Sequence, residues 1–158
     1  MAVPVAGGVL PPAILPARGA RRAESTVVLP ASAEACPAFE DFVDSLAFLA
    51  SRERARLRLA GGEILDNLVR HAAPLERDRL SIRAAKRPGG IVLAFFFRSP
   101  SFASFAARCS DPEPLFDPVK RRWRGIGMVM CRNLSSRVRL RPGERLDRIF
   151  LSFPHDSD

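Results

Sequence analysis

The sequence is poor in the residue types that build disulfide frameworks and zinc sites. Its 158 residues include three cysteines and two histidines, with one tryptophan and no tyrosine. Cys36, Cys109 and Cys131 show no paired spacing, which argues against a disulfide framework and favours reduced thiols. We expect Cys131 to pack in the core. His71 and His155 lie too far apart in the sequence for a zinc motif.

Long apolar runs are also missing. No uninterrupted stretch of about 20 apolar residues is present, so no segment is expected to span a membrane. Residues 1–17 are uncharged, but prolines and a glycine pair interrupt them and no basic segment precedes them, which argues against a secretory signal. We interpret residues 1–24 as a flexible extension, 25–153 as one domain and 154–158 as a tail. These absences predict a cytoplasmic protein.

Positive charge is in excess. The formal net charge is +8 and the sequence pI is about 11.0, with basic clusters at 52–58 and 120–124. A basic surface attracts acidic partners or nucleic acid. Along the sequence, however, the basic residues are not interleaved with aromatic ones as in a base-stacking surface. Nucleic-acid binding is therefore supported by charge alone, and it is the least favoured of the three functions that we consider.

The hydrophobic pattern predicts an α+β chain. Strands are expected at 25–29, 80–86, 91–97, 137–141 and 147–153, and helices from the Ser32 cap to about Ala50, at 52–73 with a Ser51 cap, and at 128–135. The first helix is expected to bury its periodic apolar residues, Phe39, Phe42, Val43, Leu46 and Leu49. This order predicts a two-layer α/β sandwich, in which helices cover one face of a mixed, mostly antiparallel sheet.

Glu63, Asn67 and His71 are spaced four residues apart in the second predicted helix. This spacing places a carboxylate, a carboxamide and an imidazole in one polar row. An apolar row that faces the core lies beside it, formed by Leu57, Ile64, Leu68 and Ala72. Oxygen ligands of this kind suit Mg²⁺, although an amphipathic helix with a hydrated face gives the same pattern.

A glycine-containing segment precedes the third predicted helix. Gly125 and Gly127 lie in the segment Arg124–Met128, of sequence RGIGM. Glycines at a helix N-terminus let backbone amides approach a phosphate, and the helix dipole favours the anion. The alternative is an ordinary helix start.

Together these segments resemble those of a known family. The stretch 62–72 (GEILDNLVRHA) is similar to the N box, and RGIGM to the second glycine box, of the Bergerat-fold (GHKL, histidine kinase-like) ATP-binding domains, in particular the small serine-kinase anti-sigma factors. The resemblance covers about residues 25–153. It implies ATP as the ligand and residues 99–124 as a lid over it. It also implies a sigma factor and a STAS-type antagonist as partners, and a possible homodimer.

The resemblance also implies roles for individual residues. Asn67 would hold Mg²⁺, and Glu63 would orient or deprotonate the attacking hydroxyl. The phosphates would contact the second glycine box, namely Arg124, Gly125, Ile126, Gly127 and Met128. Apolar residues are expected to anchor the lid, namely Phe102, Phe105, Leu115, Phe116 and Trp123. We interpret His71 as a structural helix-end residue and Asp66 as pointing away from the site.

One departure from the family concerns adenine. The family carries an Asp-x-Gly motif after the strand that follows the N-box hairpin, and its aspartate receives the adenine amine. Here Arg98, Ser99 and Pro100 follow that strand, and an arginine offers no acceptor. Asp111 or Asp117 would substitute only if the loop folds back. The sequence therefore leaves two leading functions open, an anti-sigma serine/threonine kinase and a pseudoenzyme that binds proteins through a Bergerat fold.

Overall fold

Seven strands and four helices follow one another within the described residues, 23–71, 79–110 and 113–155, of the computed structural model. The strands are β1 (Glu24–Pro30), β2 (Arg79–Arg87), β3 (Gly90–Phe97), β4 (Leu115–Asp117), β5 (Arg122–Arg124), β6 (Arg137–Arg141) and β7 (Asp147–Phe153). The helices are α1 (Ala35–Ser45), α2 (Ser51–His71), α3 (Phe102–Cys109) and α4 (Ile126–Leu134). Most of the expected extension and tail, Asp111, and the predicted end of the second helix after His71 lie outside the described residues.

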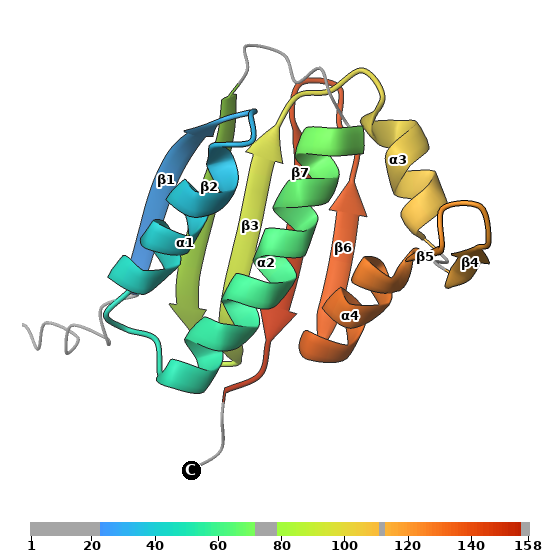
Figure 1. The fold of residues 1–158 in the computed structure, drawn as a ribbon. Helices are drawn as coiled ribbons and strands as arrows, with labels where there is room; N and C mark the ends of the chain where they lie inside the picture. The colour runs from blue at the N-terminus through green and yellow to red at the C-terminus, as the bar shows by residue number, and fades with distance from the viewer. Residues whose placement is uncertain (1–22, 72–78, 111–112, 156–158) are drawn as a thin grey trace, which may run out of the picture.

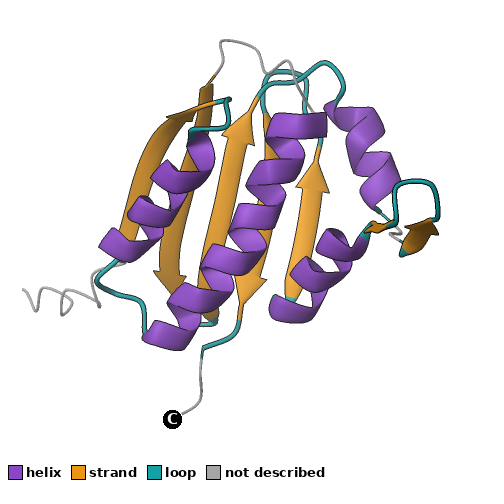
Figure 2. Ribbon diagram, viewed as in Figure 1, coloured by secondary structure: helices purple, strands orange, loops and turns teal. Residues whose placement is uncertain are grey.

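Five strands form one sheet in the order β1-β2-β3-β7-β6. Figures 1 and 2 show α1, α2 and α4 on one face of this sheet, with the β4–β5 hairpin projecting beside α3 and α4. The predicted two-layer α+β sandwich is confirmed. Within the described sheet every neighbouring pair is antiparallel, so the sheet is not mixed. The two helices between β1 and β2 return the chain to the end at which β1 finishes, and β2 therefore runs antiparallel to β1.

The core lies between the sheet and the helices. Strand residues alternate between the two faces of a sheet, so every second residue of the central strands faces the helices. On β3 these residues include Leu93 and Phe95, and on β7 they include Ile149 and Leu151. All four are fully buried. None of the described helices covers the opposite face of the sheet (Figure 2).

The apolar residues that periodicity assigns to the first helix are all buried: Phe39, Phe42 and Val43 in α1, and Leu46 and Leu49 in the connection that follows it. The helix ends at Ser45, however, and not near Ala50. Leu46 leaves the helical conformation with φ −77° and ψ 86°. The Arg54 guanidinium of α2 donates hydrogen bonds to the carbonyls of Leu46 and Leu49. These carbonyls therefore have hydrogen-bond partners although the helix does not continue.

The second helix buries Leu57, Ile64 and Leu68, as predicted. It begins at Ser51 itself, so Ser51 is not the capping residue. Instead, the backbone amide of Ala50 donates a hydrogen bond of 2.8 Å to the Glu53 carboxylate. In a capping box, the side chain at the third helical position accepts a hydrogen bond from the backbone amide of the N-cap residue. Glu53 and Ala50 form this half of the motif.

The predicted lid segment contains structure that its irregular sequence did not indicate. Helix α3 and the β4–β5 hairpin both form within residues 99–124. Phe102 and Phe105 are buried, as expected for anchors. Leu115, Phe116 and Trp123 are exposed on the hairpin, so the prediction that they anchor the lid is wrong. No helix in the described part of the chain is long and apolar enough to cross a membrane.

A pair of adjacent glycines in α2 provides a test of the helix packing. A Cβ at Gly61 would lie 2.7 Å from Leu93 Cδ2 and closer still to Phe39 Cζ, whereas a Cβ at Gly62 would meet nothing within 4 Å. We expect Gly61→Ala to lower the free energy of unfolding by about 1–3 kcal/mol through overpacking. Gly62→Ala should raise it by about 0.5–1 kcal/mol, because alanine forms helices better.

Urea denaturation of both variants checks this prediction. The two substitutions are chemically identical and one residue apart, so each is the control for the other. Equal effects would contradict the close approach of α2 to α1 and β3.

Candidate functional site

Two adjoining cavities lie between α2, α3, α4 and the β4–β5 hairpin. Their volumes are about 520 and 530 Å³, within the usual range for small-molecule sites. Both are lined by a shared set of residues, Glu63, Asn67, His71, Gly125 and Gly127. Every residue that the N-box and glycine-box patterns assign to nucleotide or metal lines at least one of the two cavities.

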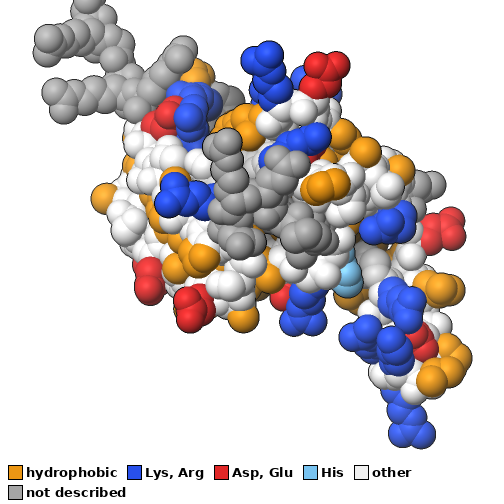
Figure 3. Space-filling model, turned by 90° about the horizontal axis from the view of Figure 1, so that it is seen from above, with side chains coloured by type: hydrophobic (Ala, Val, Ile, Leu, Met, Phe, Trp, Pro, Cys, Tyr) orange, Lys and Arg blue, Asp and Glu red, His pale blue; other side chains and the backbone are white. Residues whose placement is uncertain are grey.

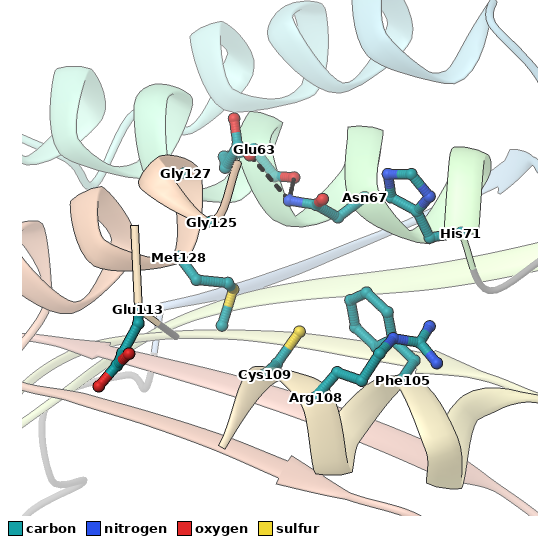
Figure 4. A pocket seen from close by; sticks show the side chains of 10 residues that line it. All are labelled: Glu63, Asn67, His71, Phe105, Arg108, Cys109, Glu113, Gly125, Gly127 and Met128. Atoms are coloured by element: carbon teal, nitrogen blue, oxygen red, sulfur yellow. Dashed lines mark hydrogen bonds between the residues drawn. The ribbon is translucent and has the colours of Figure 1, made fainter. Parts of the chain in front are cut away.

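Two hydrogen bonds fix the orientation of the Asn67 side chain. Its Nδ2 donates to the backbone carbonyl oxygen and to Oε1 of Glu63, each at 2.8 Å. Figure 4 shows Glu63, Asn67 and His71 of α2 along one side of the first cavity, opposite the side chains of α3. Within the described residues, Asn67 Oδ1 accepts no hydrogen bond. The amide oxygen is therefore free to bind a ligand.

The start of α4 packs directly against the Glu63 side chain. A Cβ at Gly127 would lie 2.7 Å from Glu63 Cγ and closer still to its carboxylate, so only glycine fits beside this rotamer. Gly125 precedes the helix with a left-handed φ of 77°, a conformation that glycine adopts without strain. The first amides of α4 have no partner within the helix and therefore lie available beside Glu63 and Asn67.

The two cavities differ in character. Phe105, Cys109 and Met128 give the first an apolar wall. Arg108 and Glu113 add charge there. The second is lined by basic side chains of the hairpin segment, Lys120, Arg122 and Arg124. Figure 3 shows the hairpin as a projection at the lower right that carries both basic and hydrophobic side chains. The pair thus offers an apolar compartment next to a basic one.

Arg98 does not point into either cavity. Its guanidinium donates a hydrogen bond of 2.9 Å to the Gly143 carbonyl and lies 3.5 Å from the Asp147 carboxylate. Asp147 is buried and also accepts hydrogen bonds from the backbone amides of Ser99 and Gly143. This carboxylate is adjacent to the end of β3, but its oxygens are bonded to the backbone of the connections that follow β3 and precede β7.

Asp117 does not take the place of the adenine aspartate, and Asp66 differs from expectation. Asp117 accepts hydrogen bonds from the amides of Val119 and Lys120 and pairs with Arg124, so it shapes the hairpin turn and lines neither cavity. The Lys120 amide, followed by Arg124, holds the pKa of Asp117 below its usual value. Asp66, expected to point away from the site, lines the second cavity and pairs with Arg70 at 2.7 Å.

The three cysteines are free thiols with raised pKa values. Burial, followed by the Glu63 carboxylate, raises the pKa of Cys131 to about 12. Its thiol donates to the Ala60 carbonyl in the core, in agreement with the packing role predicted for it. Burial also raises the pKa values of Cys36 and Cys109. These thiols stay protonated at neutral pH, so they are poor nucleophiles.

The donor set of the site fits a magnesium ion that arrives with a phosphate ligand. Asn67 supplies a hard amide oxygen atom, which Mg²⁺ prefers, and the Glu63 carboxylate lies beside it. The described residues contain no cluster of three or more His, Cys, Asp or Glu side chains that would hold a metal alone. Mg²⁺ commonly takes only one or two protein ligands and completes its shell with water and substrate phosphates. The residues therefore suit a metal–nucleotide complex better than a free ion.

Some lining residues were not predicted from the sequence. Phe105, Arg108 and Cys109 share one face of α3, and their i, i+3 and i+4 spacing is the signal that would have found them. Glu113 and Lys120 come from an irregular segment and had no such signal.

Comparison with protein-family models gives no match, and no curated protein matches the chain. Functional assignment therefore depends on the site geometry and on the N-box and glycine-box patterns.

Proposed function

We propose that this chain is a Bergerat-fold ATP-binding protein that acts as a serine/threonine kinase and anti-sigma factor. The observation that carries the proposal is the juxtaposition of Glu63 and Asn67 on α2 with the glycine-bounded start of α4. A carboxylate, an oriented amide oxygen and unpaired helix amides then meet in one cavity. These are the groups that phosphoryl transfer from a metal–nucleotide complex requires.

The proposal gives each group one role. Asn67 holds Mg²⁺ through Oδ1, and the first amides of α4 bind the phosphates. Glu63 accepts the proton of the attacking serine hydroxyl. The basic hairpin residues Arg122 and Arg124 neutralise phosphate charge, and the apolar wall beside Phe105 receives the base. Mg²⁺, when bound, supplies charge stabilisation to the transferred phosphoryl group.

The biological setting of this proposal rests on the family resemblance. By this resemblance, the chain acts in the cytoplasm, binds a sigma factor, and phosphorylates a STAS-type antagonist on serine. It regulates transcription by switching between these two binding partners. The exposed hairpin residues Phe116 and Trp123, whose rings lie 5.4 Å apart, offer an apolar contact for a protein partner.

A second candidate is a pseudoenzyme that binds proteins without ATP. The Arg98–Asp147 pair favours it, because the Asp147 carboxylate, beside the end of β3, is buried and already bonded to two backbone amides. An adenine amine would then lack the acidic acceptor that the family provides, which reduces discrimination.

Calorimetry with ATP and ADP, with and without Mg²⁺, tests the proposal. We expect Mg²⁺-dependent ATP binding by the wild type, and Asn67→Ala should weaken it about 100-fold, as for loss of a metal-orienting group. Leu59→Ala, at an exposed position of the same helix, is the control that should leave binding unchanged. Absence of ATP binding in the wild type would favour the pseudoenzyme. Phosphorylation of a STAS-type partner on serine separates a kinase from a non-catalytic ATP-binding protein.

A further inference from the structure

The face of the five-stranded sheet opposite α1, α2 and α4, named here the open sheet face, carries aromatic rings on its two central strands. Leu93, Phe95, Ile149 and Leu151 face the helices, so alternation turns Phe96 of β3 and Phe150 of β7 to the open face. Both rings are partly exposed. Their centroids lie 6.2 Å apart with an interplanar angle of 89°, so the two rings form one aromatic patch.

Arginines surround this aromatic patch. The strand register places Arg148 opposite Phe96 and Arg139 opposite Phe150. Arg137 and Arg141 alternate with inward residues on the edge strand β6 and face the same way. From the other side, the Arg83 guanidinium lies 5.4 Å from the centre of the Phe96 ring. Basic and aromatic groups are thus interleaved across strands, although they are not interleaved along the sequence.

Little negative charge balances these arginines. Glu24 lies at the β1 edge and pairs with Arg83 and Arg87. No ion pair is formed by Arg137, Arg139 or Arg141 within the described residues. Partial burial, followed by Arg137 and Arg141, lowers the pKa of Arg139. An anionic ligand would relieve the repulsion between these cations.

A shallow groove runs beside the Phe150 ring. Its volume is about 270 Å³, and its lining combines Val92, Phe150 and Ser152 with the arginines of β6. An aromatic or apolar floor with guanidinium groups along one side matches the two parts of a nucleotide, a flat base and a charged phosphate.

We propose that the open sheet face binds single-stranded nucleic acid. Bases stack on Phe96 and Phe150, and the surrounding arginines contact the phosphates. Bases can stack on these rings only where they are not already stacked and paired in a duplex, so single strands are the fitting form. A second copy of this chain fits poorly, because it would bring another set of unpaired arginines against the first.

Fluorescence anisotropy tests the proposal with the full chain and labelled single-stranded RNA of about 16 nucleotides, the same DNA sequence, and its duplex. We expect single strands to bind more tightly than the duplex, and log affinity to fall with log salt. Phe150→Leu keeps an apolar side chain but removes the ring and should weaken binding about tenfold. Arg139→Gln should reduce the salt slope by about 0.7 for the phosphate contact it removes.

Arg121→Gln is the matched control, since it removes the same charge from the hairpin turn and should leave the affinity largely unchanged. Thermal unfolding confirms that each variant is folded, and Arg139→Gln tests the surface even if Phe150→Leu fails to fold. The proposal is overturned if no single strand binds at low salt, or if Arg121→Gln and Arg139→Gln weaken binding equally. It is also overturned if polyglutamate binds as tightly as RNA and Phe150→Leu has no effect, which indicates an acidic protein partner. ATP binding depends on the opposite side of the sheet, so neither result decides the kinase proposal.

Discussion

Asp147→Ala is expected to lower the free energy of unfolding by about 3–5 kcal/mol, as for removal of one partner from a buried ion pair. The Asp147 side chain is 2% exposed and accepts hydrogen bonds of 2.9 and 3.1 Å from the Ser99 and Gly143 amides. Alanine would leave both amides without this acceptor. It would also leave the Arg98 guanidinium beside a site that has lost its negative charge.

Urea denaturation measures this effect, with Asp44→Ala as the control. Asp44 pairs with Arg58 on the surface, so its loss should cost less than about 1 kcal/mol. Asp147→Asn retains one carbonyl acceptor, so its loss in free energy of unfolding should lie between those of Asp147→Ala and Asp44→Ala. If Asp147→Ala lowers the free energy of unfolding no more than Asp44→Ala does, the Asp147 carboxylate does not hold together the connections that contain Ser99 and Gly143.

The same contacts decide how the missing adenine carboxylate can be tested. Arg98→Asp would place an aspartate where the Asp-x-Gly motif of the resembled ATP-binding domains has one, although Pro100 would remain in place of the glycine. In the structure it would remove a guanidinium that lies 3.5 Å from Asp147 and add a second carboxylate nearby. Like charges at this distance raise the cost of burying Asp147. Failure of Arg98→Asp to gain ATP binding would therefore reflect damage to the fold as much as the chemistry of the site.

The central fold could be predicted because its signals are local and periodic. The i, i+3, i+4 pattern of α2 and the runs of β3 and β7 each occur within a few residues of sequence. The same periodicity brought Glu63 and Asn67 to one face. Helix α3 was missed because its periodic stretch is short and lies among prolines.

Other features depend on contacts between distant parts of the chain. Arg98 and Asp147 are 49 residues apart, and nothing in either local sequence indicates that they pair. The open sheet face is of the same kind. Phe96, Phe150 and Arg139 come from three strands, and only the register β3–β7–β6 places them together. The composition shows that arginine is abundant, but only the pairing of strands determines which aromatic residues lie beside the arginines.

Gly127→Ala is expected to weaken Mg²⁺-dependent ATP binding about 100-fold while leaving the chain folded. The added Cβ would overlap the Glu63 carboxylate, which is the end of a flexible side chain and can rotate away. Rotation breaks the Glu63 Oε1 bond that orients the Asn67 amide. The metal ligand and the base then lose their geometry together, even though neither residue has been changed.

A double-mutant cycle with Glu63→Ala tests whether the effect passes through Glu63. Calorimetry with Mg²⁺·ATP should show that Gly127→Ala causes a large loss in the wild-type background and little further loss once Glu63 is alanine. The free energy of unfolding should show the same coupling, because alanine is favoured over glycine by about 1 kcal/mol in a helix when nothing obstructs it. Gly62→Ala, next to Glu63 but in open space, should leave ATP binding unchanged. Additive losses in the cycle would mean that Gly127 acts on the nucleotide directly, through its own backbone amide, and that the contact with Glu63 is incidental.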